Sequence, residues 1–185
     1  AARGSHFELM ASWGLSRDLG PEPVLGQAIP LGSTLSTGVD SAAILRLEPS
    51  GTLLFMGENT ALSPKVIEEP SYPRTEIDVP KGRLRALIAP GRALRLRSPE
   101  AITLAGLELP GGGWTDLGIL VGEGLDSAAV RTGLAVWTRL GSGAEYQVGL
   151  QLGPGHKANA RDLSLQALPL GAGEWEASFG DLVRP

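Results

Sequence analysis

Apolar and polar residues alternate along much of the chain in short runs, which is the pattern typical of β-strands. The clearest run covers residues 41–48, where Ala43, Leu45 and Leu47 share one side of an extended chain. Residues 49–51 form a turn and residues 52–56 run back, which predicts a β-hairpin. Further strands are expected at residues 27–35, 60–67, 76–79, 83–88, 93–97, 101–109, 118–121, 128–139, 144–152, 163–168 and 175–182.

Only one stretch, residues 127–140, has some helical character. It contains several β-branched residues and a central glycine, Gly133, and both features favour strand over helix. Short strands separated by regular turn signals are typical of sandwiches and barrels. The chain is therefore predicted to be all-β, a sandwich or prism-like arrangement of short antiparallel strands and hairpins with little or no helix.

The composition agrees with this fold class and excludes several others. The 185 residues include 26 glycines and 14 prolines, which disfavour helical bundles and coiled coils. Hydrophobic residues make up 42% of the chain, which is too much for a disordered protein. The absence of cysteine excludes disulfides and thiolate sites. No apolar run approaches the roughly 18 residues of a membrane-spanning helix.

Two features suggest how the chain is organised. Residues 3–6, Arg-Gly-Ser-His, resemble the remnant of a purification tag, so residues 1–10 are left out of the expected fold. Native sequence is then expected to begin near Met10, and any export signal or anchor to precede it. The glycines at 111–113 mark a seam between residues 11–110 and residues 111–185. The second segment is either a divergent continuation of the first domain or a second small β domain.

Residues 25–88 combine turn glycines and alternating strands in a recognisable order. The matching segments are Gly-Ser-Thr-Leu-Ser-Thr-Gly at 32–38, Ser-Ala-Ala-Ile-Leu-Arg-Leu at 41–47, Gly-Thr-Leu-Leu-Phe at 51–55, Glu-Asn-Thr-Ala-Leu at 58–62 and Lys-Gly-Arg-Leu-Arg-Ala-Leu at 81–87. In this order they resemble the FecR-like domain family. Beyond Pro90 the match weakens, because Gly106 is followed by leucine where the family has threonine.

The resemblance implies an extracytoplasmic β domain of a bacterial envelope protein, in the periplasm or at the cell surface. In the named members of the family, this domain relays a signal from an outer-membrane receptor to a membrane-bound anti-sigma regulator. No catalytic residues accompany it. The resemblance thus implies a non-enzymatic binding or signal-relay domain that contacts another envelope protein.

Positive charge is concentrated in residues 81–97, in a chain whose net charge is −4. This segment has no acidic residue, and a hairpin at residues 89–91 would place arginines from two strands side by side. The predicted anion-binding or partner-binding face consists of Arg83, Arg85, Arg92, Arg95 and Arg97. An acidic peptide or an anionic glycan would suit it. Alternatively, these arginines pair with acidic residues of a neighbouring strand.

Other candidate chemistry in the sequence is weaker. Nucleic acid is the least expected partner, because the chain is acidic overall and no aromatic residues interleave the arginines. His156 is the one histidine outside residues 1–10, and no carboxylate flanks it at ligand spacing. Glu174 and Glu176 could form a carboxylate pair on a strand, although such pairs usually face solvent. We therefore expect no metal, no cofactor and no enzymatic activity.

Trp114 offers an alternative function. It follows three glycines and precedes Thr115 and Asp116, so it could be exposed as a stacking platform for a sugar. Packing in the core or at its rim is the other interpretation. An exposed Trp114 would favour a structural or carbohydrate-binding module of a cell-wall or surface protein.

Overall fold

The computed structural model describes residues 5–18, 21–67, 74–106, 112–122, 126–140, 149–162 and 166–183, and it is mostly β. The strands are β1 (His6–Arg17), β2 (Ala28–Pro30), β3 (Leu35–Glu48), β4 (Thr52–Met56), β5 (Ala61–Ile67), β6 (Arg74–Ile88), β7 (Leu94–Arg97), β8 (Ala101–Ala105), β9 (Thr115–Val121), β10 (Ser127–Thr132), β11 (Ala135–Arg139), β12 (Leu150–Leu152), β13 (His156–Asn159) and β14 (Leu168–Pro169). One short helix, α1 (Glu174–Phe179), continues into a 3-10 helix, η1 (Gly180–Val183). The all-β prediction is confirmed.

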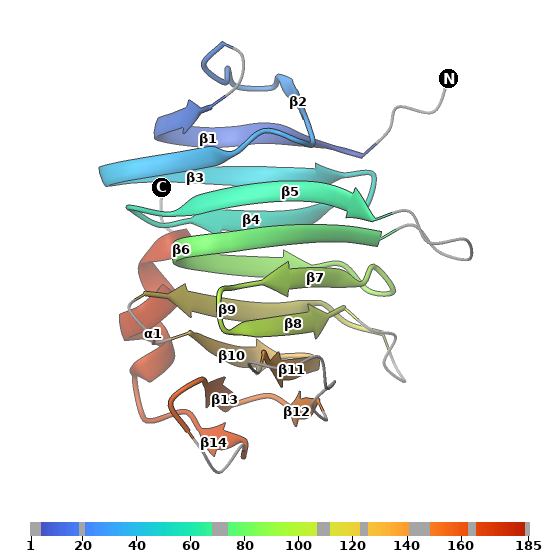
Figure 1. The fold of residues 1–185 in the computed structure, drawn as a ribbon, viewed down its shortest axis with the longest axis vertical. Coiled ribbons are helices and arrows are strands. Elements are labelled where there is room, and N and C mark those ends of the chain that lie inside the picture. The colour runs from blue at the N-terminus through green and yellow to red at the C-terminus, as the bar shows by residue number, and fades with distance from the viewer. Residues whose placement is uncertain are drawn as a thin grey trace.

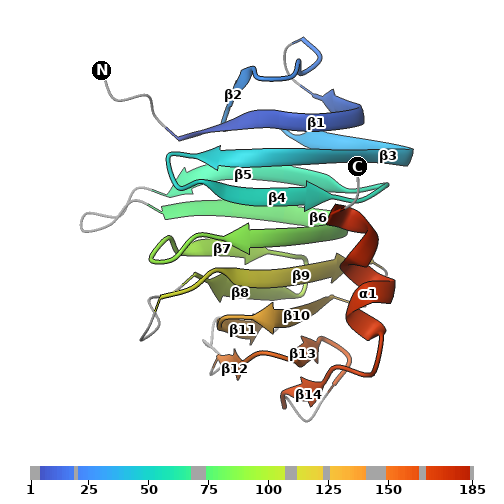
Figure 2. The same cartoon turned by 180° about the vertical axis from the view of Figure 1, so that it is seen from behind.

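The strands stack as a sandwich with two faces, seen from opposite sides in Figures 1 and 2. The front face contains β5, β7, β8, β11 and β12, and the back face contains β4, β9, β10, β13 and β14. Three long strands, β1, β3 and β6, take part in both faces. The first half of β6 pairs with β5 and β7, and its second half pairs with β4 and β9.

Glycine allows β6 to bend from one face to the other. Gly82 has φ +103°, which disfavours any residue with a side chain, and a Cβ there would overlap the backbone of Thr60. The Thr60 hydroxyl accepts a hydrogen bond from the Arg83 N–H at 2.9 Å, just past the bend. The bend and the residue that supports it both lie in the segments that resemble the FecR-like pattern.

The main core fills the space between the two faces. It extends from Phe7 to Ala160, so strands on both sides of the boundary expected at residue 111 contribute to it. Phe7 and Leu9 are fully buried in this core. Residues 6–10 were left out of the expected fold. In the structure they belong to β1: their buried and more exposed side chains alternate, and their backbone pairs with β3.

A second, smaller apolar cluster lies on the outer side of the back face, where α1 and η1 pack (Figure 2). Its buried residues, which we call the outer cluster, are Phe55, Ala129, Trp175, Phe179 and Leu182. A Cβ on Gly118 of β9 would overlap the ring of Phe179, so the helix packs closely against the sheet at this glycine. The strand expected at residues 175–182 is wrong, because its apolar residues recur at helical spacing and cover one side of a helix.

Several local predictions can be compared with the strands directly. The hairpin of residues 41–56 is confirmed, since Leu47 of β3 lies opposite Thr52 of β4. Residues 127–140 form strand rather than helix, as predicted, but the expected single strand is broken at Gly133 into β10, which pairs with β9, and β11, which pairs with β8. The strands expected at 101–109, 144–152 and 163–168 and the seam at 111–113 lie partly outside the described residues.

Candidate functional site

The predicted arginine hairpin does not form, because the turn after β6 leads from the back face to the front face. β7 pairs in parallel with the first half of β6, so Arg95 lies opposite Glu76 and Arg97 opposite Asp78. Arg83 and Arg85 belong to the second half of β6, which pairs with β4 and β9. The four arginines therefore occupy two different faces and do not line one surface.

Arg85 is buried at the outer cluster. Its guanidinium donates two hydrogen bonds, of 2.8 and 2.7 Å, to the carboxylate of Asp116 on β9. The same group lies 5.3 Å from the centre of the Trp175 ring, within range of a cation–π interaction. With 6% of its surface exposed, Arg85 connects the sheet to α1 rather than presenting charge to solvent.

Arg95 also pairs inside the molecule. Its Nε lies 2.9 Å from one oxygen of the buried Glu76, and Lys65 Nζ lies 3.0 Å from the other. The hydrogen bond to Glu76 raises the pKa of Lys65. Arg95 thus fits the alternative interpretation, in which an arginine pairs with an acidic residue of a neighbouring strand.

Arg92 and Arg97 are exposed, and neither forms an ion pair within the described part of the chain. Arg92 lines a small cavity of about 200 Å3 beside Ser50 and Thr75. Arg97 lines another, of about 290 Å3, beside Asp78 and Pro99. These two predicted binding residues remain available to solvent, but they line separate cavities.

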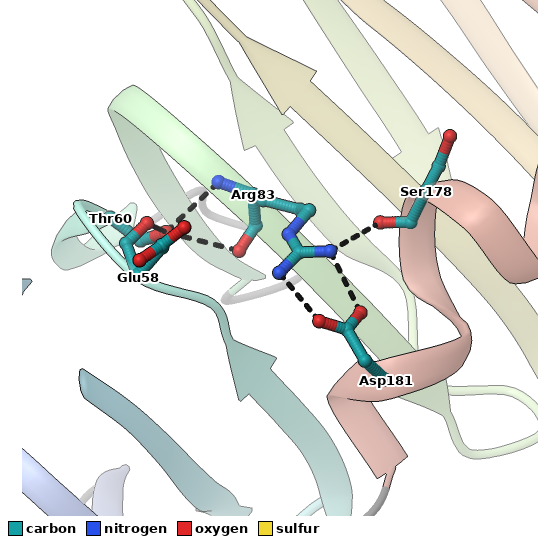
Figure 3. Close-up of polar contacts among 5 residues, drawn as sticks. All are labelled: Glu58, Thr60, Arg83, Ser178 and Asp181. Carbon is teal, nitrogen blue, oxygen red and sulfur yellow. Dashed lines mark hydrogen bonds and ion pairs between the residues drawn. The ribbon is translucent and has the colours of Figure 1, made fainter. Parts of the chain in front are cut away.

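Arg83 lies where the sandwich meets the C-terminal segment (Figure 3). Its guanidinium forms a bidentate ion pair with Asp181 of η1, with distances of 2.7 and 2.8 Å, and donates to the carbonyl of Ser178 at 3.0 Å. The backbone of Arg83 is held by Thr60, as described above. Arg83 therefore joins the bend of β6 to the end of the chain.

Two hollows meet at Arg83 and Glu58, which line both of them. The smaller, of about 320 Å3, runs past Trp13, Asp40 and Asp181. The larger, of about 940 Å3, crosses the bend in the middle of β6 and the adjoining parts of β9, β10 and β13, and we call it the cationic groove. Its lining residues are Glu58, Asn59, Lys81, Gly82, Arg83, Leu120, Val121, Gly122, Ser127, Lys157, Asn159, Arg161 and Glu174.

The charged residues of the cationic groove come from distant parts of the sequence. Lys81 belongs to β6, Lys157 to β13, and Arg161 to the turn that follows β13. They meet because β6 pairs with β9, β9 with β10, and β10 with β13. The sequence did not predict Lys157 and Arg161 as site residues, because no sequence pattern connects them with the positive charges at residues 81–97.

Glu174 is held at the rim of the groove. It accepts hydrogen bonds from Lys157 and, at 2.7 Å, from the N–H of Gly171. Both hydrogen bonds lower the pKa of Glu174, and the one from Lys157 has the larger effect. Glu174 and Glu176 lie on a helix and not on a strand, and Glu176 approaches Arg131 at 3.8 Å. The two carboxylates therefore have different cationic partners.

The remaining candidates are a histidine and an exposed tryptophan. His156 is exposed, with Nδ1 3.0 Å from the carbonyl of Pro154, and the described residues contain no group of three or more side chains suited to a metal. Trp114 is 49% exposed just before β9, so it does not pack in the core. Trp13, which the sequence did not single out, is exposed to a similar degree.

Hydropathy gives no membrane-spanning helix within the part of the chain that the structure describes.

Comparison with known proteins gives a likeness of fold. No protein-family model and no curated protein matches the sequence. Two crystal structures of "a putative anti-sigma factor from Parabacteroides distasonis ATCC 8503", at 1.65 and 2.50 Å resolution, each match with a TM-score of 0.54 and identities of 14% and 15%. Both matches cover 78% of this chain, which spans only 63% and 62% of those chains. This chain thus has a fold similar to that of the Parabacteroides protein.

Proposed function

We propose that this β domain is a non-enzymatic module that relays a signal by contacting a protein partner. The observation that carries the proposal is the similarity of fold to a protein described as a putative anti-sigma factor. The resemblance of residues 25–88 to the FecR-like family favours the same function. Both point to recognition of another protein rather than to a chemical reaction.

We further propose that the partner is an envelope protein and that the domain works in the periplasm or at the cell surface of a bacterium. This location follows from the FecR-like resemblance. The partner would contact the side of the sandwich that carries the cationic groove, where the bend of β6 meets the C-terminal segment through Arg83 and Asp181. Contact there would reach both the sheet and α1.

Site-specific photo-crosslinking in the native host tests this function. A photoreactive residue replaces Gly122, which is exposed in the groove and has open space at its Cβ. The matched control replaces Gln151, which is exposed on β12 of the front face. We expect a discrete protein adduct from position 122 and none from position 151. Equal labelling from both positions, or no protein adduct, would count against the proposal.

A second candidate function is a carbohydrate-binding or structural module of a cell-wall or surface protein. It is favoured by one observation, the 49% exposure of Trp114, because exposed aromatic rings can stack on sugars. Retention on a peptidoglycan column that is lost in Trp114→Ala, but kept in the control Trp13→Ala, would support it. Absence of retention in the wild-type protein would reject it.

A further inference from the structure

The cationic groove contains two positive charges that the described residues leave unpaired. Arg83 is paired with Asp181, and Lys157 with Glu174. Lys81 and Arg161 are both exposed, and no ion pair within the described residues involves either of them. In a chain with a net charge of −4, these two side chains make the groove a local site of positive charge.

The groove also has an apolar floor. Leu120 is half-buried and Val121 is buried at the end of β9, and the following Gly122 leaves the space above it open. The volume of about 940 Å3 lies near the upper end of the range for sites that bind small molecules, so the groove is large enough to hold a few side chains of a partner. An apolar side chain could therefore cover Leu120 while polar groups reach the cations at the rim.

The character of the rim selects among anionic ligands. Glu58 and Glu174 line the same groove, so a densely charged polymer would meet repulsion beside its attraction. Its described lining residues include no aromatic side chain on which a base or sugar could stack. Arginine and lysine at separate positions instead suit separate carboxylates, which arginine can bind through two hydrogen bonds.

We propose that the cationic groove binds an extended acidic segment of the partner protein. Two of its carboxylates pair with Lys81 and Arg161, and an apolar side chain between them covers Leu120. The proposal rests on the function proposed above, and it names the chemistry of the partner at that site. The acidic groups are therefore recognised at the cationic groove, which forms only in the folded chain, and not at the predicted arginine hairpin.

Fluorescence polarisation with a labelled peptide tests the proposal on the intact protein. The probe is Gly-Glu-Leu-Glu-Glu-Leu-Glu-Gly, and the control probe has glutamine in place of every glutamate. The variant is the double change Lys81→Ser and Arg161→Ser. The charge-matched comparison is Arg92→Ser with Arg97→Ser, which removes two other exposed cations outside the groove. Circular dichroism checks that every variant is folded.

We expect the groove variant to weaken binding by about tenfold or more and the comparison variant by about twofold or less. The glutamine probe should bind as weakly as the acidic probe binds to the groove variant. Equal losses in the two variants, no saturable binding to the wild-type protein, or tighter binding of a heparin fragment that displaces the peptide would overturn the proposal. If the groove variant still crosslinks to its partner from position 122, the proposed function stands and this inference fails.

Discussion

The two apolar clusters of this molecule are built in different ways. The main core is enclosed between two hydrogen-bonded faces that share β1, β3 and β6. The outer cluster lies between the sheet and the two short helices α1 and η1, which cover it without a second hydrogen-bonded face. Side chains such as Arg83 and Arg85 hold these helices to the sheet. We therefore expect the C-terminal segment to open as a local unit and the sandwich to unfold as a whole.

The largest effect is expected from a cavity in the main core. Leu84 is fully buried in the part of β6 that pairs with β4 and β9. Leu84→Ala should lower the free energy of unfolding by about 3 kcal/mol, because the surrounding strands cannot close the cavity. Urea denaturation followed by circular dichroism measures this loss. A loss below about 1 kcal/mol would show that the sandwich is less tightly packed than its burial indicates.

A smaller and local effect is expected at the contact between β9 and α1. Gly118→Ala should push the Phe179 ring away and weaken the packing of α1 by about 1–2 kcal/mol. Gly122→Ala is the matched control, because a Cβ there meets no atom within 4 Å. Hydrogen–deuterium exchange should rise in residues 174–183 of the first variant and stay unchanged in β3 and β6. If exchange rises in all strands together, the two clusters form one unit and the comparison fails.

The ion pair between Arg83 and Asp181 should contribute less. Asp181→Asn removes a partly exposed bidentate pair and should destabilise the C-terminal segment by about 0.5–1 kcal/mol at low salt. The difference should shrink as salt is added, because salt screens exposed charges. Glu22→Gln makes the same change of charge at an exposed residue and should have no effect on α1. An equal response in both variants would mean that net charge, rather than this pair, is responsible.

The smallest effect concerns pH. Lys157 and the Gly171 N–H lower the pKa of Glu174 from its ordinary value of 4.5. The contribution of Glu174 is therefore complete above pH 4.5 and is lost as the pH falls through its lowered pKa in the folded protein. Relative to the intrinsic rate at each pH, exchange in α1 should rise over this acidic range in the wild-type protein and vary less in Glu174→Gln. Identical pH profiles would show that Glu174 does not help to hold the helix.

Much of the fold could be predicted because its signal is local. Side chains alternate with a period of two along any strand, so residues 41–48 of β3, the whole of β4 and the hairpin between them follow from the sequence, whereas the start of β3 at Leu35 does not. The parallel pairing of β6 with β7 could not be predicted in this way. Residues 89–91 have the composition of a hairpin turn, and only the three-dimensional arrangement sends the chain to the other face.

The candidate site could be predicted only in part, for the same reason. The concentration of positive charge at residues 81–97 includes Lys81 and Arg83, and both of these residues line the groove. Arg85 and Arg95 form internal ion pairs, with Asp116 and Glu76, and Arg92 and Arg97 are exposed elsewhere. The pair with Asp116 could not be predicted, because this partner comes from a strand that is distant in sequence. Lys157 and Arg161 reach the groove through three successive strand pairings, which no sequence pattern records.

The bend of β6 at Gly82 also has a consequence for how the chain folds. One strand contacts four others, β4, β5, β7 and β9, which come from before and after it in the sequence and from both faces. A hairpin with the preceding strand, β5, satisfies only part of its first half. The hydrogen bonds of its second half form only with β4 and β9, which lie further away along the chain. Such high contact order makes folding slow and strongly cooperative. Because β6 belongs to both faces, we expect the two faces of the sandwich to form together.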